Sequence, residues 1–327
     1  MHSDRDRVFL TGATGFVGSH VLKELLRAGF PVRALVRDSG IRLDCETVVG
    51  DLERAGELSN ALKDCRYLVH CAARYSFAPS GRAALKHVNV TGTESLFAAA
   101  HVAGVERAVL TSSSATVGPA HGDHLARESD YAHDGGNGYH ASKLAQERVA
   151  VSSRVPTVVV LPTAPVGPND HKPTPTGTMI LNFARGRMFA KPPSGGLNLV
   201  PVEDVARAHV SALLKGVAGE RYILGGENLT LDELWEMLSE ITGKPVPRAR
   251  IPTPVLYTIA YVDEMRCLIR RDAEPLVPLE GVRMAEERMF VDSSKAAREL
   301  DFRPGGVRGA LERAVAWYRE RGYLGVS

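Results

Sequence analysis

Short apolar runs alternate with longer segments of helical period over the first half of the chain. Six runs stand out, at residues 7–10, 32–36, 47–50, 67–73, 107–113 and 157–162: RVFL, VRALV, TVVG, YLVHCAA, RAVLTSS and TVVVLP. Short runs of this kind that end at polar residues are typical of buried strands. Strands that alternate with helices predict an α/β fold built on a doubly wound, mostly parallel sheet.

The pattern changes after Pro162. Prolines and glycines crowd residues 162–177, and a helical period resumes at residues 178–190. Residues 198–216 predict a return to the sheet through one more strand and helix, and Thr230 with Glu233 forms a capping-box signature. We therefore predict two domains: residues 1–165 with 197–220 form the larger one, and residues 166–196 with 221–327 form a smaller, mixed α/β one.

Composition narrows the class of ligand. The 327-residue chain has a formal net charge of +2 and no long basic run, so neither nucleic acid nor a membrane surface is expected as a partner. Cys45, Cys65, Cys71 and Cys267 lack the paired spacing of metal or redox sites, which favours reduced thiols. No apolar segment reaches membrane length. We expect a soluble cytoplasmic protein that binds a small molecule, without membrane insertion.

The segment TGATGFVGSH, residues 11–20, follows the first predicted strand directly. Gly12, Gly15 and Gly18 are spaced G-x-x-G-x-x-G and lead into a helix that begins near Phe16. Glycines permit a tight turn and let the backbone approach a pyrophosphate, which then lies at the electropositive helix N-terminus. Such turns also arise for purely steric reasons, but the position after the first strand favours a dinucleotide in a Rossmann domain.

Two residues bear on the choice of dinucleotide. Arg37 ends the second strand in ALVRDSG and Asp38 follows it. An acid at this place would bind the 2′-hydroxyl of NAD, whereas an arginine accommodates the 2′-phosphate of NADP. NADP is therefore expected rather than NAD, although Arg37 could be only a solvated strand end. Asp51 follows the third strand in GDLE, where it could bind adenine or serve as a helix N-cap.

A chemical trio is suggested by LTSSSATVG and YHASK. Ser112, Ser113 and Ser114 end the fifth strand, and Tyr139 and Lys143 lie one helical turn apart. In a doubly wound sheet, ligands bind at the carboxyl ends of the strands, where these residues would meet a nicotinamide. An ammonium near Tyr139 would lower the pKa of its phenol, and a serine hydroxyl would orient the substrate oxygen.

These segments, with GDL, CAA and NVTGTESL, resemble the extended short-chain dehydrogenase/reductase family (the NAD-dependent epimerase/dehydratases) over nearly the whole chain. PVGPNDHKPTPTG and GERYILGGENLTL are similar to the hopanoid-associated sugar epimerases and dihydroflavonol-4-reductase-like proteins. The resemblance implies a catalytic pair of Tyr139 and Lys143, and it leaves the catalytic hydroxyl open between Ser113 and Ser114. A homodimer is also expected. The expected cofactor contacts are Gly12, Thr14, Gly15, Phe16, Val17, Gly18, Arg37, Asp51, Leu52, Ala72, Ala73, Tyr139, Lys143, Pro162 and Ala164.

Other polar residues are weaker candidates. A loop holding His121, Asp123, His124, His133 and Asp134 matches no common metal site, so we expect no metal. Asn89 could be a tolerated polar position in a helix, whereas the resemblance implies that it supports Lys143 through water. Three residues after the fourth strand are candidates for the substrate pocket: Arg74, Tyr75 and Phe77.

The sequence thus predicts an NADP-preferring oxidoreductase that interconverts a secondary alcohol and a carbonyl. A sugar epimerase is the alternative within enzymes, and a dinucleotide-sensing binding protein is the alternative outside them. In nucleotide-sugar members of the family an asparagine commonly stands where this chain has Ala164, and a methyl group cannot donate a hydrogen bond to a diphosphate. Lys172, Arg185 and Arg187 could serve a phosphate instead, or form a solvated face. A substrate with an apolar or aromatic body is therefore expected.

Overall fold

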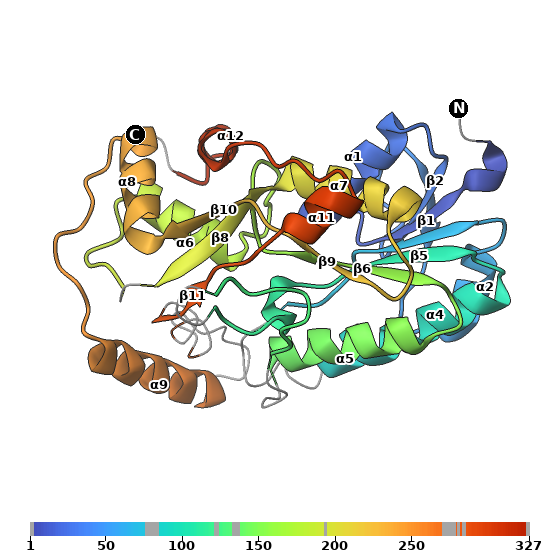
Figure 1. Ribbon diagram of the computed structural model, residues 1–327, viewed down its shortest axis with the longest axis horizontal. Coiled ribbons are helices and arrows are strands. Elements are labelled where there is room, and N and C mark those ends of the chain that lie inside the picture. The colour runs from blue at the N-terminus through green and yellow to red at the C-terminus, as the bar shows by residue number, and fades with distance from the viewer. Residues whose placement is uncertain are drawn as a thin grey trace.

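The computed structural model describes residues 3–75, 85–120, 124–132, 138–192, 195–269, 279, 282 and 286–324. In this described part, seven parallel strands form the larger sheet in the order β3-β2-β1-β4-β5-β6-β9 (Figure 1). The direction of the strand order reverses at β1, which pairs with β2 on one side and with β4 on the other. The strands are β1 (Val8–Thr11), β2 (Val32–Val36), β3 (Glu46–Val49), β4 (Tyr67–His70), β5 (Arg107–Thr111), β6 (Thr157–Pro162) and β9 (Arg221–Leu224).

Helices cover both faces of this sheet (Figure 1). Val8 and Leu10 face one helical layer, and Phe9, between them, packs into the core on the other side, because successive strand residues point to opposite faces. The first layer contains α1 (Phe16–Arg27), α7 (Val202–Lys215) and α11 (Ser294–Glu299). The second contains α2 (Ala55–Ala61), α4 (Gly92–Val102) and α5 (Tyr139–Ser152). A π-helical segment, η3 (His87–Thr91), leads into α4, and two 3₁₀ turns are η1 (Asp4–Asp6), before β1, and η4 (Ser114–Thr116), after β5.

A smaller mixed sheet is centred on β8 (Gly196–Pro201). This strand pairs in parallel with β7 (Ala164–Val166) and β11 (Arg288–Met289), and antiparallel with β10 (Glu227–Thr230). Its core includes Phe183 and Trp235, whose rings stack with centroids 5.7 Å apart. The helices around it are α6 (Pro175–Ala184), α8 (Leu231–Thr242) and α12 (Val307–Glu320), and α9 (Thr253–Ile269) lies at the edge of the molecule (Figure 1).

The predicted α/β fold and the six strands of the first half are confirmed, as is the capping box, in which Thr230 and Glu233 bond reciprocally. Two later strands differ from the prediction. Residues 196–201 join the small sheet, and residues 221–224 complete the large one beside β6. The apolar sequence pattern did not predict these pairings because both strands are largely buried. A buried apolar run indicates a strand but does not indicate which strand is its partner. The division into two domains stays a prediction.

Three properties of the described residues complete the fold. The four cysteines are all free. Nowhere in the described ranges does a helix combine the length and apolarity that crossing a bilayer requires. Within the same ranges, no group of three or more histidines, cysteines and carboxylates is arranged to hold a metal ion, and His121, Asp123, His133 and Asp134 lie outside them.

Candidate active site

The predicted site residues gather at one edge of the large sheet. Gly12 follows β1, Arg37 follows β2, Ala72 lies two residues beyond β4, and Ser112 follows β5. Because these strands are parallel, their carboxyl ends meet at the same edge, which is where doubly wound folds bind their ligands. The sequence therefore brings the glycine loop, the strand-end arginine and the serine run to one side of the molecule.

The glycine loop has two glycines that the fold requires and a third that is less constrained. Gly12 has a φ of 77°, and a Cβ on it would lie 2.6 Å from the Ala72 nitrogen. A Cβ on Gly18 would overlap the Gly12 carbonyl oxygen. Gly15 is exposed at the N-cap of α1, and its φ of −83° and ψ of 171° are open to any residue, although a Cβ on it would lie 3.3 Å from the Gly12 carbonyl oxygen. A bound pyrophosphate would explain the glycine at this helix N-terminus, where the first turn carries no acid.

The other expected cofactor contacts line the same edge. Thr14, Arg37 and Ala73 are exposed, whereas Phe16, Val17, Asp51 and Ala72 are half-buried. Leu52 is buried, Pro162 ends β6 as a buried residue and Ala164 begins β7 half-buried. Their contact with a cofactor stays a prediction.

Asp51 and Asp38 both form local turns. Asp51 Oδ1 accepts a hydrogen bond from the Glu53 N–H at 3.1 Å, and α2 begins only at Ala55 with Arg54 as its N-cap. The alternative that Asp51 caps this helix is therefore wrong. Asp38 Oδ1 accepts from the Gly40 N–H at 2.8 Å. Arg37, between β2 and this turn, is exposed, and no hydrogen bond or ion pair engages its guanidinium among the described residues.

The serine run divides into one structural and two available hydroxyls. Ser112 is buried and its Oγ donates to Glu147 Oε1. Ser113 caps η4, with its Oγ accepting the Ala115 N–H at 3.2 Å, and Ser114 begins the turn. The Ser113 hydroxyl proton stays available for a ligand in this arrangement. Ser113 and Ser114 are both half-buried, so the choice between them stays open.

Tyr139 and Lys143 occupy the first turns of α5. Tyr139 begins the helix, and its ring lies 4.6 Å from the ring of Tyr75, measured between centroids. Lys143 is only 2% exposed, and its Nζ donates to the Thr111 carbonyl oxygen at 2.8 Å and to Gln146 Oε1 at 2.6 Å. Burial lowers the pKa of Lys143 to about 8, and the charge of Glu147 opposes that shift. Because an ammonium has three N–H donors, one remains for a ligand.

Asn89 holds the chain beyond β4. Its side chain is fully buried, with Oδ1 accepting the Arg74 N–H at 2.7 Å and Nδ2 donating to the Arg74 carbonyl at 3.0 Å. Nδ2 also lies 3.1 Å from Ser142 Oγ on α5. Asn89 thus fixes the segment that carries Tyr75 against the helix of Tyr139. Support of Lys143 through water stays a prediction, and Phe77 lies outside the described residues.

Sequence reasoning missed a buried ion pair beneath the serine run. Arg221 Nε of β9 lies 3.0 Å from Glu147 Oε2 of α5, and the two side chains are 6% and 5% exposed. Thr116 Oγ1 donates to Glu147 Oε1 at 2.6 Å and accepts from Arg221 Nη2 at 2.7 Å. This pair joins the last strand of the sheet, the helix of Lys143 and the turn of Ser113.

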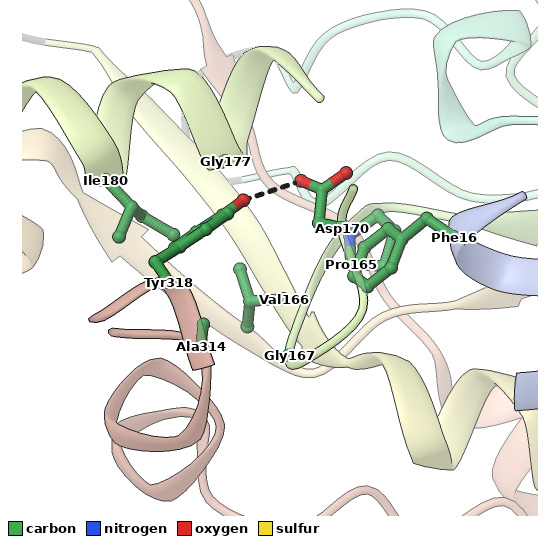
Figure 2. A pocket seen from close by; sticks show the side chains of 9 residues that line it. All are labelled: Phe16, Pro165, Val166, Gly167, Asp170, Gly177, Ile180, Ala314 and Tyr318. Atoms are coloured by element: carbon green, nitrogen blue, oxygen red, sulfur yellow. Dashed lines mark hydrogen bonds between the residues drawn. The ribbon is translucent and has the colours of Figure 1, made fainter. Parts of the chain in front are cut away.

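A small hollow lies where α1 meets the smaller sheet (Figure 2). The hollow has no interior room for even a water-sized molecule, so it is not a ligand pocket. Figure 2 shows Tyr318 of α12 and Asp170 pointing at each other, with Phe16 of α1 beside them. The Tyr318 hydroxyl donates to Asp170 Oδ2 at 2.9 Å. His20 of α1 also contacts the Pro168 carbonyl at 2.9 Å. The hollow is thus a packing junction between α1, α12 and the smaller sheet.

The fold and the glycine loop define a doubly wound dinucleotide-binding protein. The chain belongs to the NAD dependent epimerase/dehydratase family, whose model matches residues 8–225. It is 40% identical over 334 residues to the "Putative dihydroflavonol 4-reductase" of Synechocystis sp., covering 98% of this chain and 96% of that one. It is 36% identical over 330 residues to "Sterol demethylase protein B" of Methylococcus capsulatus, covering 96% of this chain and 99% of that one.

A solved structure supports the same assignment. The crystal structure of gox2253 matches with a TM-score of 0.84 and 39% identity, covering 97% of this chain and 99% of that chain. The protein is therefore an enzyme of the extended short-chain dehydrogenase/reductase type that uses a nicotinamide dinucleotide, as predicted.

Proposed function

We propose that the enzyme uses NADPH to interconvert a carbonyl and a secondary alcohol on a small organic substrate with an apolar body. The observation that carries the proposal is the buried Lys143 ammonium, which lies on α5 one turn from Tyr139 and donates to the carboxyl end of β5. The nicotinamide, when bound, supplies or accepts the hydride. Tyr139 gives or takes the proton, and Ser113 or Ser114 orients the substrate oxygen.

The chemistry of the pair follows from charge and burial. A phenol with a pKa near ~10 is a weak base at neutral pH, but a neighbouring ammonium favours its phenolate. With a pKa of about 8, Lys143 is mostly charged at neutral pH, and it loses that charge as the pH rises through its pKa. The free N–H of Lys143 would hold the nicotinamide ribose, and Gly12, Gly15 and Gly18 would hold the pyrophosphate.

The preference for NADPH rests on Arg37. Arg37 stands at the strand end itself and its side chain is exposed, whereas Asp38 follows it and uses one carboxylate oxygen in a local turn with the Gly40 N–H. Arg37→Ala should weaken NADPH binding by about 1–3 kcal/mol, the range of a charge-assisted hydrogen bond, and barely change NADH binding. Isothermal titration calorimetry with both cofactors measures this.

Arg27→Ala is the matched control for charge. Arg27 lies in the last turn of α1, exposed and bonded to Glu24, away from the strand ends. Its loss should leave both cofactors bound as in the parent. Equal losses for NADPH and NADH in Arg37→Ala, or tighter NADH binding in the parent, would show that Arg37 does not read a phosphate.

The substrate class is inferred from the hydrogen-bond donors that a diphosphate would need and that this site does not offer among the described residues. Ala164 packs beside the apolar core of the smaller sheet and offers no donor. Of the three cations that could replace it, Arg185 donates through Nε at 2.8 Å to the carbonyl of Tyr323, which follows α12. Lys172 and Arg187 are exposed. The relative named sterol demethylase protein B agrees with a substrate of low polarity.

We therefore expect ketones with an apolar or aromatic body to be reduced with net consumption of NADPH. UDP- and dTDP-sugars should bind weakly or not at all. A panel of both classes, followed by cofactor absorbance and by the structure of the product, tests this. Micromolar binding of a nucleotide sugar, with an inverted carbon centre and no net cofactor oxidation, would favour the epimerase. Cofactor binding with no turnover on either class would contradict the proposed substrate class.

A further inference from the structure

The chain contains one glutamine, Gln146, and it lies against the lysine of the proposed pair. Its side chain is fully buried on α5, three residues after Lys143. Oε1 accepts from Lys143 Nζ at 2.6 Å, and Nε2 donates to Thr93 Oγ1 at 2.9 Å. An ammonium can only donate, so the orientation of the amide is fixed by its partner. Gln146 therefore meets the cation with its carbonyl end.

The other end of the amide is anchored through two elements. The Thr93 hydroxyl donates to the Asn89 carbonyl at 2.8 Å, so the same oxygen is left to accept from Gln146. His70 Nε2 lies 2.9 Å from Thr93 Oγ1, and His70 Nδ1 lies 2.6 Å from Thr11 Oγ1 at the end of β1. Burial lowers the pKa of His70 to about 3, so this imidazole is neutral. Gln146 is thus tied to α4 and, through His70, to the strand that leads into the glycine loop.

The groups that face Lys143 leave its charge without a direct carboxylate partner. Its two acceptors, the Thr111 carbonyl and Gln146, are both uncharged. Cys71 stays a thiol because burial raises its pKa to about 11. Glu147 acts on Lys143 only through space, since its oxygens face Ser112, Thr116 and Arg221.

We propose that Gln146 is a positioning residue that holds the Lys143 ammonium with an uncharged acceptor, so that its positive charge remains available to Tyr139 and to the bound cofactor. The proposal rests on the proposed function for its consequence in catalysis. The other part of the proposal, the effect of Gln146 on the ionisation of Lys143, can be measured without substrate or turnover.

Two substitutions of similar size separate the role of the acceptor from that of its neutrality. Gln146→Glu keeps an acceptor and adds a negative charge, which should raise the pKa of Lys143 by about one unit or more. Gln146→Met fills the space without an acceptor, so the buried ammonium loses a partner and the pKa of Lys143 should fall. The readout is the ¹³Cε resonance of labelled lysine against pH, with the Lys143 signal assigned by its loss in Lys143→Met. Asn182→Asp adds a charge at an exposed position of α6 and should leave the midpoint of the Lys143 titration unchanged.

Turnover gives the second readout. In alcohol oxidation the phenolate form of Tyr139 accepts the proton, so the rate rises with pH through its pKa. A carboxylate at residue 146 offsets the charge of the ammonium. The pH at which kcat rises should therefore increase by about one pH unit, while NADPH affinity changes little. An unchanged Lys143 midpoint in both variants would overturn the proposal, as would a loss of turnover in Gln146→Glu without a shift in the pH at which kcat rises. If the parent turns over no substrate, the proposed function fails, and the resonance of Lys143 still decides the role of Gln146.

Discussion

Replacing Tyr139 with phenylalanine should lower the turnover for carbonyl reduction by about a hundredfold or more, the usual scale for a lost general acid. The ring and its contact with Tyr75 remain, and only the hydroxyl that we propose exchanges the proton is removed. Because we propose that the glycine loop and the strand ends supply most of the contacts to NADPH, its affinity should stay nearly unchanged. Steady-state kinetics and calorimetry on the same preparation measure both quantities.

Tyr67→Phe is the matched control for this prediction. Tyr67 begins β4, so it lies away from the carboxyl ends of the strands, and the variant removes its hydroxyl while its ring keeps the edge-to-face contact with Phe30. This variant should keep turnover within a few-fold of the parent, since we assign Tyr67 no part in binding or proton transfer. Retained turnover in Tyr139→Phe would instead exclude Tyr139 as the proton donor.

The features predicted best from sequence are those encoded by neighbouring residues. The six apolar runs became strands because a buried parallel strand has an almost continuous apolar sequence. The position of Gly12, Gly15 and Gly18 in a strand-to-helix turn also followed from local order, as did the start of α1 at Phe16. The partners of β8 and β9 did not, because strand pairing depends on contacts between distant segments.

Prediction of the site from sequence is limited for the same reason, because its contacts join segments that are distant along the chain. Three successive serines look alike in sequence, and only the packing of Glu147 against Ser112 reserves that hydroxyl for structure. Gln146 and Glu147 follow Lys143 on a helix whose polar residues would ordinarily face solvent, and their partners Thr93 and Arg221 come from elsewhere in the chain. One signal was present for His70, since a histidine at the end of an apolar run is a polar group that burial obliges to find partners.

Breaking the ion pair between Arg221 and Glu147 should have the largest effect on stability. The two charges face each other without an aligned Nε–H hydrogen bond, and other Arg221 nitrogens donate to the Glu128 carbonyl and to Thr116. Arg221→Met would leave the Glu147 carboxylate buried without its cation. The expected loss is about 3–5 kcal/mol in the free energy of unfolding, as for other buried pairs that lose one partner. Urea denaturation measures this.

A double variant separates the lost pair from the lost packing. Arg221→Met with Glu147→Gln removes both charges and keeps an acceptor for Ser112 and Thr116, so it should regain much of the lost stability. Arg313→Met, which removes the cation of a partly exposed pair with Glu203, should cost far less because water solvates the charge that remains. If the double variant were as unstable as Arg221→Met alone, packing and hydrogen bonds of Arg221 would account for the loss. Recovery would identify the buried charge of Glu147 as the cause, and with it the ion pair as the contact that holds the serine turn against the helix of Tyr139 and Lys143.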